Sequence, residues 1–354
     1  MDNSGKLFNI DELYEAQDDS EYTINQAAHT QNMLPAGENR ERILCVGEAP
    51  SVEDDKAGKP FVEDGKSGEL LRAVCGEIGI DVDRDMLLTH VITTHPLRGK
   101  FPKWGDIGWY LKQLTNLIDE TQPKLIVCLG ARAARAVLDP NYSLVNMTMY
   151  RARGRLIPRG NSWVGCTYHP SYINRMGGLD SEYGAHFVKD VAKYCLSTPS
   201  PPRIVEPGDI IHDCDFDKMA EEFLREENWP IAYDLETTGL IPGQDHIICV
   251  SYCGAKTSAY VTMLDTPEAH HFYDWFINSK IPKIIHNAQF ENSWSLEQFG
   301  NSVADVVWDT QLVEHGLDSR KDIKGNTALE TVTFLRFNRY YKGLVNRKSM
   351  STTE

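Results

Sequence analysis

The stretch AYDLETTGL, residues 232–240, carries two carboxylates one residue apart within a pattern typical of a buried strand. Successive side chains of a strand alternate between its two faces, so Asp234 and Glu236 point to the same side. Two like charges placed this way repel each other, and burial makes each charge more costly. A bound divalent cation would reverse that cost, because Mg²⁺ and Mn²⁺ prefer oxygen ligands. The pattern indicates either a metal site or a solvated face of an edge strand.

Two further motifs, GEAP and YHPSY, each follow an apolar run that predicts a strand. Gly47 permits a tight turn after the first of these strands, and Pro50 stiffens that turn. Ligands of open α/β sheets bind at the carboxyl ends of strands, where Glu48 and His169 could share one pocket. Taken alone, His169 is explained equally well as a hydrogen-bonded turn residue, and Glu48 is just as ambiguous.

Strands and helices alternate along the first half of the chain. Strands are predicted at 42–47, near 86–92, at 124–130 and at 162–168, and helices near 66–79, 106–120, 131–138 and 183–196. This alternation implies a parallel sheet that is covered by helices on both faces. Residues 1–40 are polar, acidic and aperiodic, and are predicted to form a flexible arm, so the first folded domain is placed at residues 41–196.

A proline-rich linker at 197–212 leads to a second module at 213–354. Strands are predicted near 230–235, 246–253, 257–263 and 283–286, and helices near 215–227, 267–278, 309–316, 326–337 and from 289 onward. The predicted fold class is therefore α/β with two modules.

Charge is unevenly distributed along the chain. The net charge of −15 over 354 residues argues against broad, non-specific binding of nucleic acid. Residues 131–175 nevertheless hold seven arginines against one aspartate, while residues 1–40 hold eight acidic and two basic residues. The arginines could form a local face that follows DNA phosphates, or they could be ordinary surface charge.

The short apolar runs of the sequence argue against a membrane protein. No apolar run approaches the ~18 residues of a membrane span, and the polar start is not typical of a signal peptide. We therefore expect a cytoplasmic protein without a membrane partner. The eight cysteines contain no C-x-x-C pair and fall mostly in apolar runs, which predicts reduced, structural thiols.

The motifs within residues 41–196 together resemble the uracil-DNA glycosylase superfamily, and its family 4 in particular. The matching segments are Gly47–Pro50, Gly58, Pro60–Val62, LGARAARAVL at 129–138, RARGRLI at 151–157 and His169–Ser171. The resemblance implies a parallel-sheet α/β/α sandwich that grips a base flipped out of the DNA duplex.

The same resemblance implies roles for single residues. Phe61 would stack on the flipped base, and the loop of Gly47 and Glu48 would lie near the sugar–base bond. His169 would donate to uracil O2 as negative charge develops there, beside Ser171 of the same motif. Flanking phosphates would contact three arginines, namely Arg151, Arg153 and Arg155.

The chain also departs from family 4. That family binds an iron–sulfur cluster through four cysteines, and no cysteine here falls in that pattern, so no cluster is expected. His90 replaces the uracil-reading asparagine, Ser51 replaces a glycine, and Glu63 and Asp64 add negative charge to a longer loop. These changes argue against efficient uracil excision and favour a DNA-binding or interdomain platform. His90 either contacts a base in the asparagine's place or closes the pocket.

The second module resembles the DEDD-type 3′–5′ exonucleases, specifically the proofreading domain of family A DNA polymerases, over residues 213–340. Asp234 and Glu236 match the first motif of that family. The second motif is matched by Asn287, Phe290 and Glu291, where glutamate replaces the usual aspartate. The pair Asp309-Thr310 matches a frequent start of the next helix. The fold implied is a ribonuclease H-like mixed sheet.

This second resemblance implies a site for two divalent ions, Mg²⁺ or Mn²⁺, held by Asp234, Glu236 and Glu291. Three residues, Thr237, Thr238 and Leu240, would line the site of the terminal nucleotide. Asn287, counted with the substrate-binding residues, would also tie its helix to the sheet. We expect His286 and Phe290 to be structural.

The third exonuclease motif, a tyrosine followed four residues later by an aspartate, is missing, because no aspartate follows Asp322. Either the chain is a fragment, or a separate polypeptide completes it, or the module is not a working nuclease by itself.

The fusion of the two modules resembles the N-terminal part of certain bacteriophage family A DNA polymerases. The first hypothesis is therefore a replication protein, in the host cytoplasm if viral. Its exonuclease would edit single-stranded 3′ ends or primer–template DNA beside a polymerase domain or subunit. The second hypothesis is a uracil-DNA glycosylase of base excision repair. The third is a non-catalytic DNA-binding subunit of a polymerase assembly.

Overall fold

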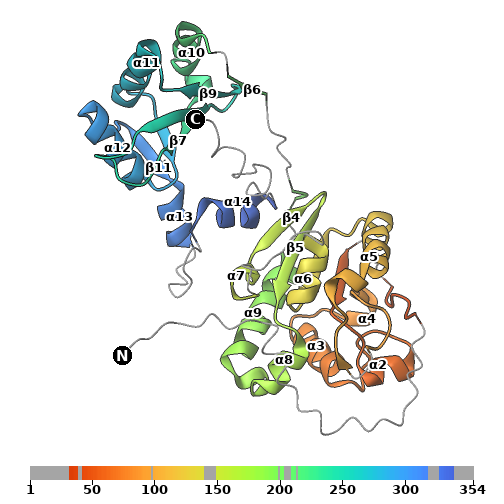
Figure 1. Ribbon diagram of the computed structural model, residues 1–354. Coiled ribbons are helices and arrows are strands. Elements are labelled where there is room, and N and C mark those ends of the chain that lie inside the picture. The colour runs from red at the N-terminus through yellow and green to blue at the C-terminus, as the bar shows by residue number, and fades with distance from the viewer. Residues whose placement is uncertain are drawn as a thin grey trace. The chain divides into compact units, whose positions relative to one another are not determined.

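The computed structural model describes residues 32–38, 42–96, 99–138, 149–197, 200–202, 209–212, 214–317 and 327–338 (Figure 1). The chain divides into two compact units, each considered by itself below. The N-terminal unit comprises residues 1–204 and 335–339, and the C-terminal unit comprises residues 205–334 and 340–354. The division at 204 falls within the proline-rich linker that the sequence predicts.

The N-terminal unit is built on a five-stranded sheet in the order β2-β1-β3-β5-β4. Its strands are β1 (Ile43–Gly47), β2 (Leu87–His90), β3 (Leu125–Leu129), β4 (Leu156–Arg159) and β5 (Ser162–Thr167). Four of them run parallel, as predicted, but β4 is antiparallel to β5. The sheet is therefore mixed, because a tight hairpin turn at Gly160 and Asn161 folds β5 back along β4.

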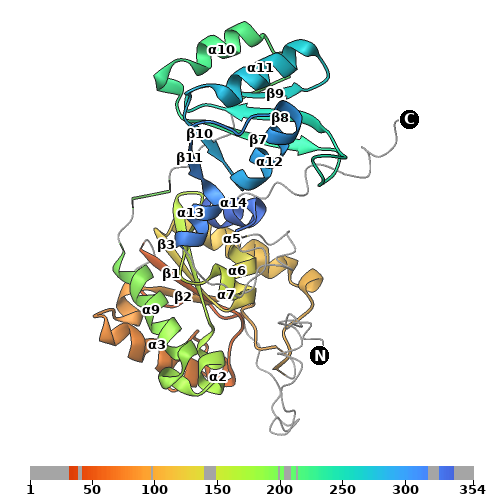
Figure 2. The same ribbon diagram turned by 90° about the vertical axis from the view of Figure 1, so that its left-hand side faces the viewer.

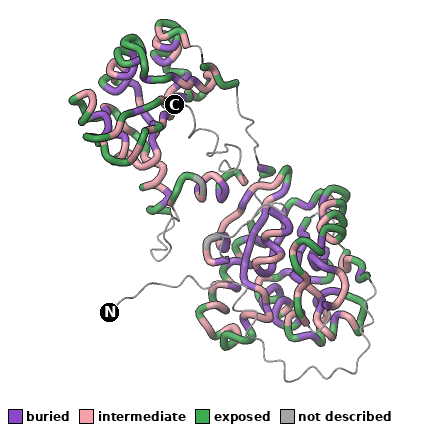
Figure 3. The backbone as a smooth tube through the Cα atoms, viewed as in Figure 1, coloured by how far each residue is buried: buried purple, intermediate pink, exposed green. Residues whose placement is uncertain are grey.

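Helices cover both faces of this sheet (Figures 1 and 2). They are α2 (Val52–Ala57), α3 (Lys66–Glu77), α4 (Val82–Asp85), α5 (Gly108–Thr121), α6 (Ala131–Leu138), α7 (Met149–Ala152), α8 (Pro170–Arg175) and α9 (Glu182–Leu196). Helix α9 packs on β3 and β5 together with α3 and α8, while α6 packs on the opposite face beside α5. Strands β1 and β3 are buried at every position, as strands covered on both faces must be (Figure 3).

Residues 32–38 belong to the folded N-terminal unit. Ala36 pairs with Leu88 in both hydrogen-bonding directions, and the Met33 N–H donates to the Thr93 carbonyl. The segment thus runs along the outer edge of β2. The folded unit begins before residue 41, where the sequence analysis placed its start, and residues 1–31 of the expected arm lie outside the described residues.

The C-terminal unit contains a six-stranded mixed sheet in the order β11-β10-β7-β8-β9-β6. Its strands are β6 (Ile210–Ile211), β7 (Ile231–Thr237), β8 (Ile247–Cys253), β9 (Ala259–Met263), β10 (Lys283–Ile285) and β11 (Val306–Asp309). Its helices are α10 (Phe216–Phe223), α11 (Pro267–Asn278), α12 (Ala288–Phe299), α13 (Thr310–Leu317) and α14 (Leu329–Phe337), the last of which contains the division between the units. The central strand β7 is antiparallel to β8 and parallel to β10.

Aromatic side chains fill the core of the C-terminal unit. Tyr233 on β7 lies 5.4 Å, ring centroid to ring centroid, from Phe276 of α11, and Tyr252 of β8 lies 5.0 Å from the same ring. Helix α12 joins this core through the hydroxyls of Tyr273 and Ser295, which lie 2.8 Å apart. The packed face of β7 is thus the face of its odd-numbered residues, which leaves the even-numbered ones on the other side. None of the helices in the described parts of the two units has the length and hydrophobicity of a membrane span.

Candidate functional site

Strand β7 carries the two acids of the AYDLETTGL stretch on one face. Ile231, Tyr233 and Leu235 are buried, whereas Asp234 is half-buried and Glu236 is exposed. The alternation therefore directs both carboxylates to the same side, as the sequence predicts. Burial raises the pKa of Asp234 to about 6, and the neighbouring charge of Glu236 adds to the rise.

Glu291, in the first turn of α12, adds a third carboxylate. Its side chain is 2% exposed, and its Oε2 atom is buried without a hydrogen-bond partner. Burial raises the pKa of Glu291 to about 8, and the negative charges of Asp234 and Asp309 raise it further. Acids from a strand and from a helix therefore lie within electrostatic reach of one another, as the second motif implies.

Asp309, at the end of β11, fixes the position of α12. Its carboxylate accepts hydrogen bonds from the backbone N–H groups of Asn287 and Ala288, at 3.1 and 2.9 Å. It also accepts from two N–H groups in the first turn of α13, those of Gln311 and Leu312. Burial opposes ionisation, but these four donors hold the pKa of Asp309 below its usual value. Asp309 thus caps two helices at once.

Asn287 takes part in this junction through its backbone. Its φ of 71° lies in the left-handed region, which asparagine tolerates better than most residues. Beside it, His286 Nδ1 lies 2.9 Å from the Thr310 hydroxyl, which itself donates to the Ile285 carbonyl. These contacts support the structural role expected for His286. Phe290 packs against the core of the unit, as expected.

The turn between β7 and β8 holds the other residues predicted to line the site. Thr237 donates its hydroxyl proton to the Gly239 carbonyl at 2.6 Å, and Leu240 is 82% exposed. The Asp245 carboxylate closes the turn by accepting the Ile241 N–H at 3.0 Å. The turn therefore presents an apolar side chain to solvent next to the acidic face.

The three carboxylates suit a hard divalent cation in donor chemistry, because all of them offer oxygen and Glu291 Oε2 has no donor of its own. Within the residues that the structure describes, however, no three His, Cys, Asp or Glu side chains are grouped tightly enough to form a metal site by themselves. A divalent ion at Asp234, Glu236 and Glu291 would therefore take most of its ligands from water or phosphate oxygens, as is common for Mg²⁺.

In the N-terminal unit, Glu48 follows β1 and is buried against Arg132 of α6. Its Oε1 accepts the Arg132 backbone N–H at 3.1 Å, and its Oε2 lies 3.3 Å from Arg132 Nη1. Burial raises the pKa of Glu48, while Arg132 works in the opposite direction. Gly130, with a φ of 98°, makes room for this carboxylate, because a Cβ there would lie 2.3 Å from Glu48 Oε1.

His169 follows β5 and begins α8. Its Nδ1 accepts the Ser171 backbone N–H at 3.2 Å, so a neutral ring carries its proton on Nε2. Burial lowers the pKa of His169 to about 3, and the positive charges nearby lower it further, so the ring is neutral. Its Nε2 is buried without a partner. The glycosylase resemblance implies a donor at this position, and a neutral ring protonated on Nε2 can be one.

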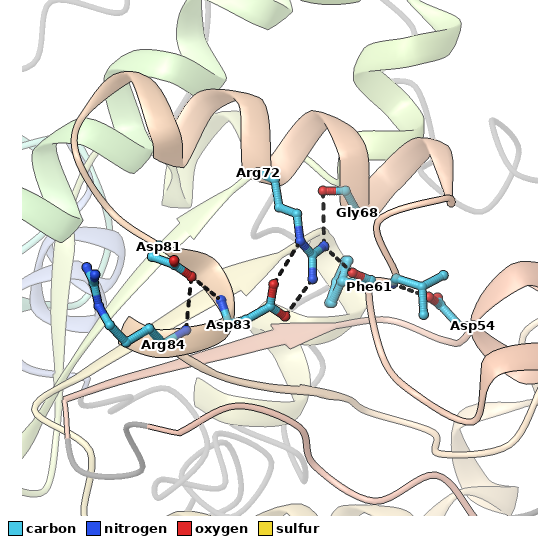
Figure 4. Close-up of polar contacts among 8 residues, drawn as sticks. Asp54, Phe61, Gly68, Arg72, Asp81, Asp83 and Arg84 are labelled. Atoms are coloured by element: carbon cyan, nitrogen blue, oxygen red, sulfur yellow. Dashed lines mark hydrogen bonds and ion pairs between the residues drawn. The ribbon is translucent and has the colours of Figure 1, made fainter.

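Phe61 is 1% exposed and has a φ of 52°, a conformation that costs a non-glycine residue about 1–3 kcal/mol. Arg72 of α3 stabilises it by donating to the Phe61 and Gly68 carbonyls while it pairs with Asp83 at 2.7 Å (Figure 4). On the other side of the loop, Asp54 accepts the Val62 N–H at 2.9 Å.

His90 lies directly against Phe61. The two ring centroids are 4.6 Å apart, and the Phe61 ring is 6.2 Å from that of His169. Gly47 permits this arrangement, because a Cβ there would lie 2.4 Å from His90 Nδ1 and 2.5 Å from the Phe61 ring. The structure thus brings Gly47, Phe61, His90 and His169 together, with Glu48 in the next loop position.

Several of the arginines that were expected to face DNA phosphates make contacts within the N-terminal unit instead. Arg153 is buried and forms two hydrogen bonds of 2.9 Å with Asp190, so its prediction as a phosphate ligand is wrong. Arg159 donates to the Val137 carbonyl, and the Arg135 guanidinium lies 4.0 Å from the centre of the Trp104 ring. The Arg151 side chain lies outside the described part of the structure. Arg155 is half-buried and stays a prediction.

Sequence reasoning missed the partner of Arg153. Asp190 also accepts the Thr167 hydroxyl at 2.9 Å, which ties α9 to β5. The sequence contains a sign of this buried pair, because Asp190 falls among Phe187, Val191 and Tyr194 on the apolar stripe of α9. An acid on such a stripe predicts a buried basic partner.

Comparison with known proteins agrees with this two-part organisation. Residues 34–192 match the model of the uracil DNA glycosylase superfamily, and residues 209–333 match a 3′–5′ exonuclease model. The type-4 uracil-DNA glycosylase of Archaeoglobus fulgidus is 29% identical over 169 residues, which are 46% of this chain and 82% of that protein. The type-4 enzyme of Thermotoga maritima is 33% identical over 138 residues, 38% of this chain and 67% of that protein.

Solved nuclease structures resemble part of the chain more distantly. A structure described as the apo form of the nuclease is 19% identical with a TM-score of 0.31, covering 40% of this chain and 65% of its own. The Nibbler exonuclease domain of Aedes aegypti is 11% identical with a TM-score of 0.31, covering 42% and 78%. The six-stranded mixed sheet of the C-terminal unit agrees with the α/β fold class and the mixed sheet that the sequence predicts. The chain therefore belongs to the uracil-DNA glycosylase superfamily through residues 34–192, and a 3′–5′ exonuclease domain is fused to it over residues 209–333.

Proposed function

We propose that the protein is a metal-dependent 3′–5′ exodeoxyribonuclease that edits DNA as part of a family A DNA polymerase assembly of bacteriophage type. The observation that carries this proposal is the set of acids Asp234, Glu236 and Glu291 on the exonuclease domain, which have no basic partner among the described residues. Two of these acids, Asp234 and Glu291, have raised pKa values, which are typical of functional sites rather than of surfaces.

Asp234, Glu236 and Glu291 would hold Mg²⁺ or Mn²⁺. When bound, such ions supply an activated water and offset the charge that develops on the phosphate. The chain itself supplies the negative surface that attracts these ions, and a turn that presents Leu240 beside it. An exposed apolar side chain at that position can pack against the terminal base of a single-stranded 3′ end, or of a frayed primer–template.

The glycosylase-like unit would serve as an accessory domain that binds the same DNA. Its phosphate contacts would come from Arg151 and Arg155, which remain predictions, and from the exposed Arg175 at the end of α8. Bonds to phosphates position a protein on DNA without reading its sequence, which suits an editing enzyme.

The test is a nuclease assay on a 5′-labelled single strand with Mn²⁺ or Mg²⁺. The wild-type protein is expected to produce a ladder of 3′-shortened products that EDTA stops. Asp234→Ala removes the ladder, whereas the matched control Glu268→Ala, an exposed acid on α11, retains it. A wild-type protein without a ladder in either metal, or a ladder that survives Asp234→Ala, would refute the proposal.

A second substrate separates editing from general degradation. A primer–template with a mismatched 3′ end should be shortened faster than the fully paired one, because the mismatched end frays into a single strand. Equal rates on the two substrates would argue for a nuclease without a proofreading role.

A further inference from the structure

The base-stacking face of Phe61 in the glycosylase-like unit is already covered by a side chain of the protein. His90 lies with its ring centroid 4.6 Å from that of Phe61 and with its plane tilted by 34°. That separation is within the range of stacked aromatic pairs. A base that stacks on Phe61 would need the space that the imidazole fills.

His90 is built into this position by its surroundings. It ends β2 in register with Gly47 of β1, and the missing side chain of Gly47 leaves room for its ring. Its Nε2 lies 3.5 Å from Asp54, a carboxylate that also caps α2 through Ser51. A hollow against His90 has no room for a water molecule, and it is lined by Met33, Leu34, Pro60, Thr89 and Thr93.

The same place retains groups that could recognise a planar ligand. His169 keeps a buried Nε2–H donor without an acceptor, and an unpaired buried donor costs about 1–3 kcal/mol. Phe61 is held in a strained left-handed conformation with its ring turned inward. An aromatic face and a neutral N–H donor together suit a nucleobase that bears a carbonyl oxygen.

We propose that His90 is an internal plug that occupies the position of a flipped base, so that the glycosylase-like unit binds DNA without extruding a base. This inference concerns a different site from the proposed exonuclease and does not depend on it. Removing the imidazole, and nothing else, should open Phe61 and His169 to a base.

The experiment compares wild-type protein with His90→Asn and His90→Ala, all in EDTA so that no metal-dependent cleavage occurs. Two fluorescent duplexes are used, which differ only in carrying a uracil or a tetrahydrofuran abasic residue opposite the same guanine. The wild-type protein should bind both equally. The two variants should prefer the uracil duplex by about tenfold, since base–aromatic stacking contributes on that scale. His186→Asn, on α9, is the matched control and should behave as wild type.

The preference of the variants should disappear again in His90→Ala/Phe61→Ala. A wild-type protein that already prefers the uracil duplex would overturn the inference, as would folded His90 variants without any preference. Should neither variant fold, the wild-type protein itself decides the question by ¹⁵N NMR of its imidazole rings. Free uracil at millimolar concentration should leave the resonances of His90 and His169 in place, and a shift of His169 would overturn the plug.

Discussion

The two candidate sites of this protein handle buried charge in opposite ways. In the glycosylase-like unit, Glu48 is matched by Arg132. Close by, the face of Phe61 is covered by His90. In the exonuclease domain, Asp234, Glu236 and Glu291 have no basic partner among the described residues. The carboxylate of the first site is therefore neutralised by a side chain of the protein, whereas the second site is left with a surplus of negative charge.

The difference indicates which site awaits a ligand. Buried polar groups in folded proteins nearly always have partners, so a carboxylate such as Glu291 without one calls for an explanation. Its raised pKa shows that the folded chain holds it at a cost in stability. A cation would remove that cost. The glycosylase-like pocket carries no comparable charge imbalance, because its groups without hydrogen-bond partners are the ring nitrogens of His90 and His169 Nε2.

The largest effect is expected for Glu291→Gln. The amide keeps the shape of the side chain but removes the charge, so exonuclease activity should fall by about 10²–10⁴-fold, as for the loss of several kcal/mol of metal-dependent stabilisation. Stability in EDTA at pH 8 should rise at the same time, because the buried charge of Glu291 is removed. Activity is measured by single-turnover cleavage, and stability by urea denaturation. A variant that is fully active would show that Glu291 does not belong to the site.

Arg153→Ala tests the glycosylase-like unit, where a buried acid, unlike Glu291, has a basic partner. It leaves Asp190 buried and uncompensated, which typically costs about 3–5 kcal/mol. Urea denaturation followed by tryptophan fluorescence measures the loss, and the double variant Arg153→Met/Asp190→Leu should recover most of it. A loss below about 1 kcal/mol would mean that the Arg153–Asp190 pair contributes no more than an exposed salt bridge does.

The pH dependence of stability should distinguish the units further. Glu291 has a folded pKa of about 8, above its ordinary value, so the folded domain binds a proton that the unfolded chain releases. Stability of the exonuclease domain without metal is therefore full below about pH 4.5, and is lost as the pH rises to about 8. Asp234, with a pKa of about 6, acts in the same direction. The expected loss is on the order of 2–4 kcal/mol.

Denaturation in EDTA at pH 5.5 and pH 8 measures this loss, and Glu291→Gln should remove most of it. Mg²⁺ at pH 8 should restore stability, while exonuclease activity should increase over the same range as the acids ionise. A stability that is independent of pH would contradict the unpaired state of these carboxylates.

Sequence patterns predicted the parts of both sites that depend on local periodicity. The strand alternation around Asp234 and Glu236 and the position of Glu291 in the first turn of a helix follow from neighbouring residues alone. The edge strand β11 was not predicted, because its Val307 and Trp308 are both exposed and show no period. Strand β4 was also missed, since an antiparallel hairpin interrupts the expected parallel order.

The closing of the glycosylase-like pocket depends on contacts between distant segments. Phe61 and His90 are 29 positions apart, and only the pairing of Gly47 with His90 across β1 and β2 brings the ring onto Phe61. The sequence therefore raised the question of His90 without deciding it. Arg153 was misplaced for the same reason, because its partner Asp190 lies on a later helix.

Asp309→Asn should produce the smallest effect. It distinguishes a residue that only holds the two helices in place from a residue that binds the metal. Asp309 lies close enough to raise the pKa of Glu291, yet all four of its hydrogen bonds go to backbone N–H groups of α12 and α13. An asparagine retains one acceptor and turns an amide donor toward other donors, so stability should fall by about 1–2 kcal/mol. Asp305→Asn, an exposed acid just before β11, is the matched control and should change little. If Asp309 only holds the helix in place, cleavage should slow by less than about tenfold at saturating Mg²⁺. A loss as large as that of Glu291→Gln would make Asp309 a metal ligand and enlarge the set of metal-binding acids from three to four.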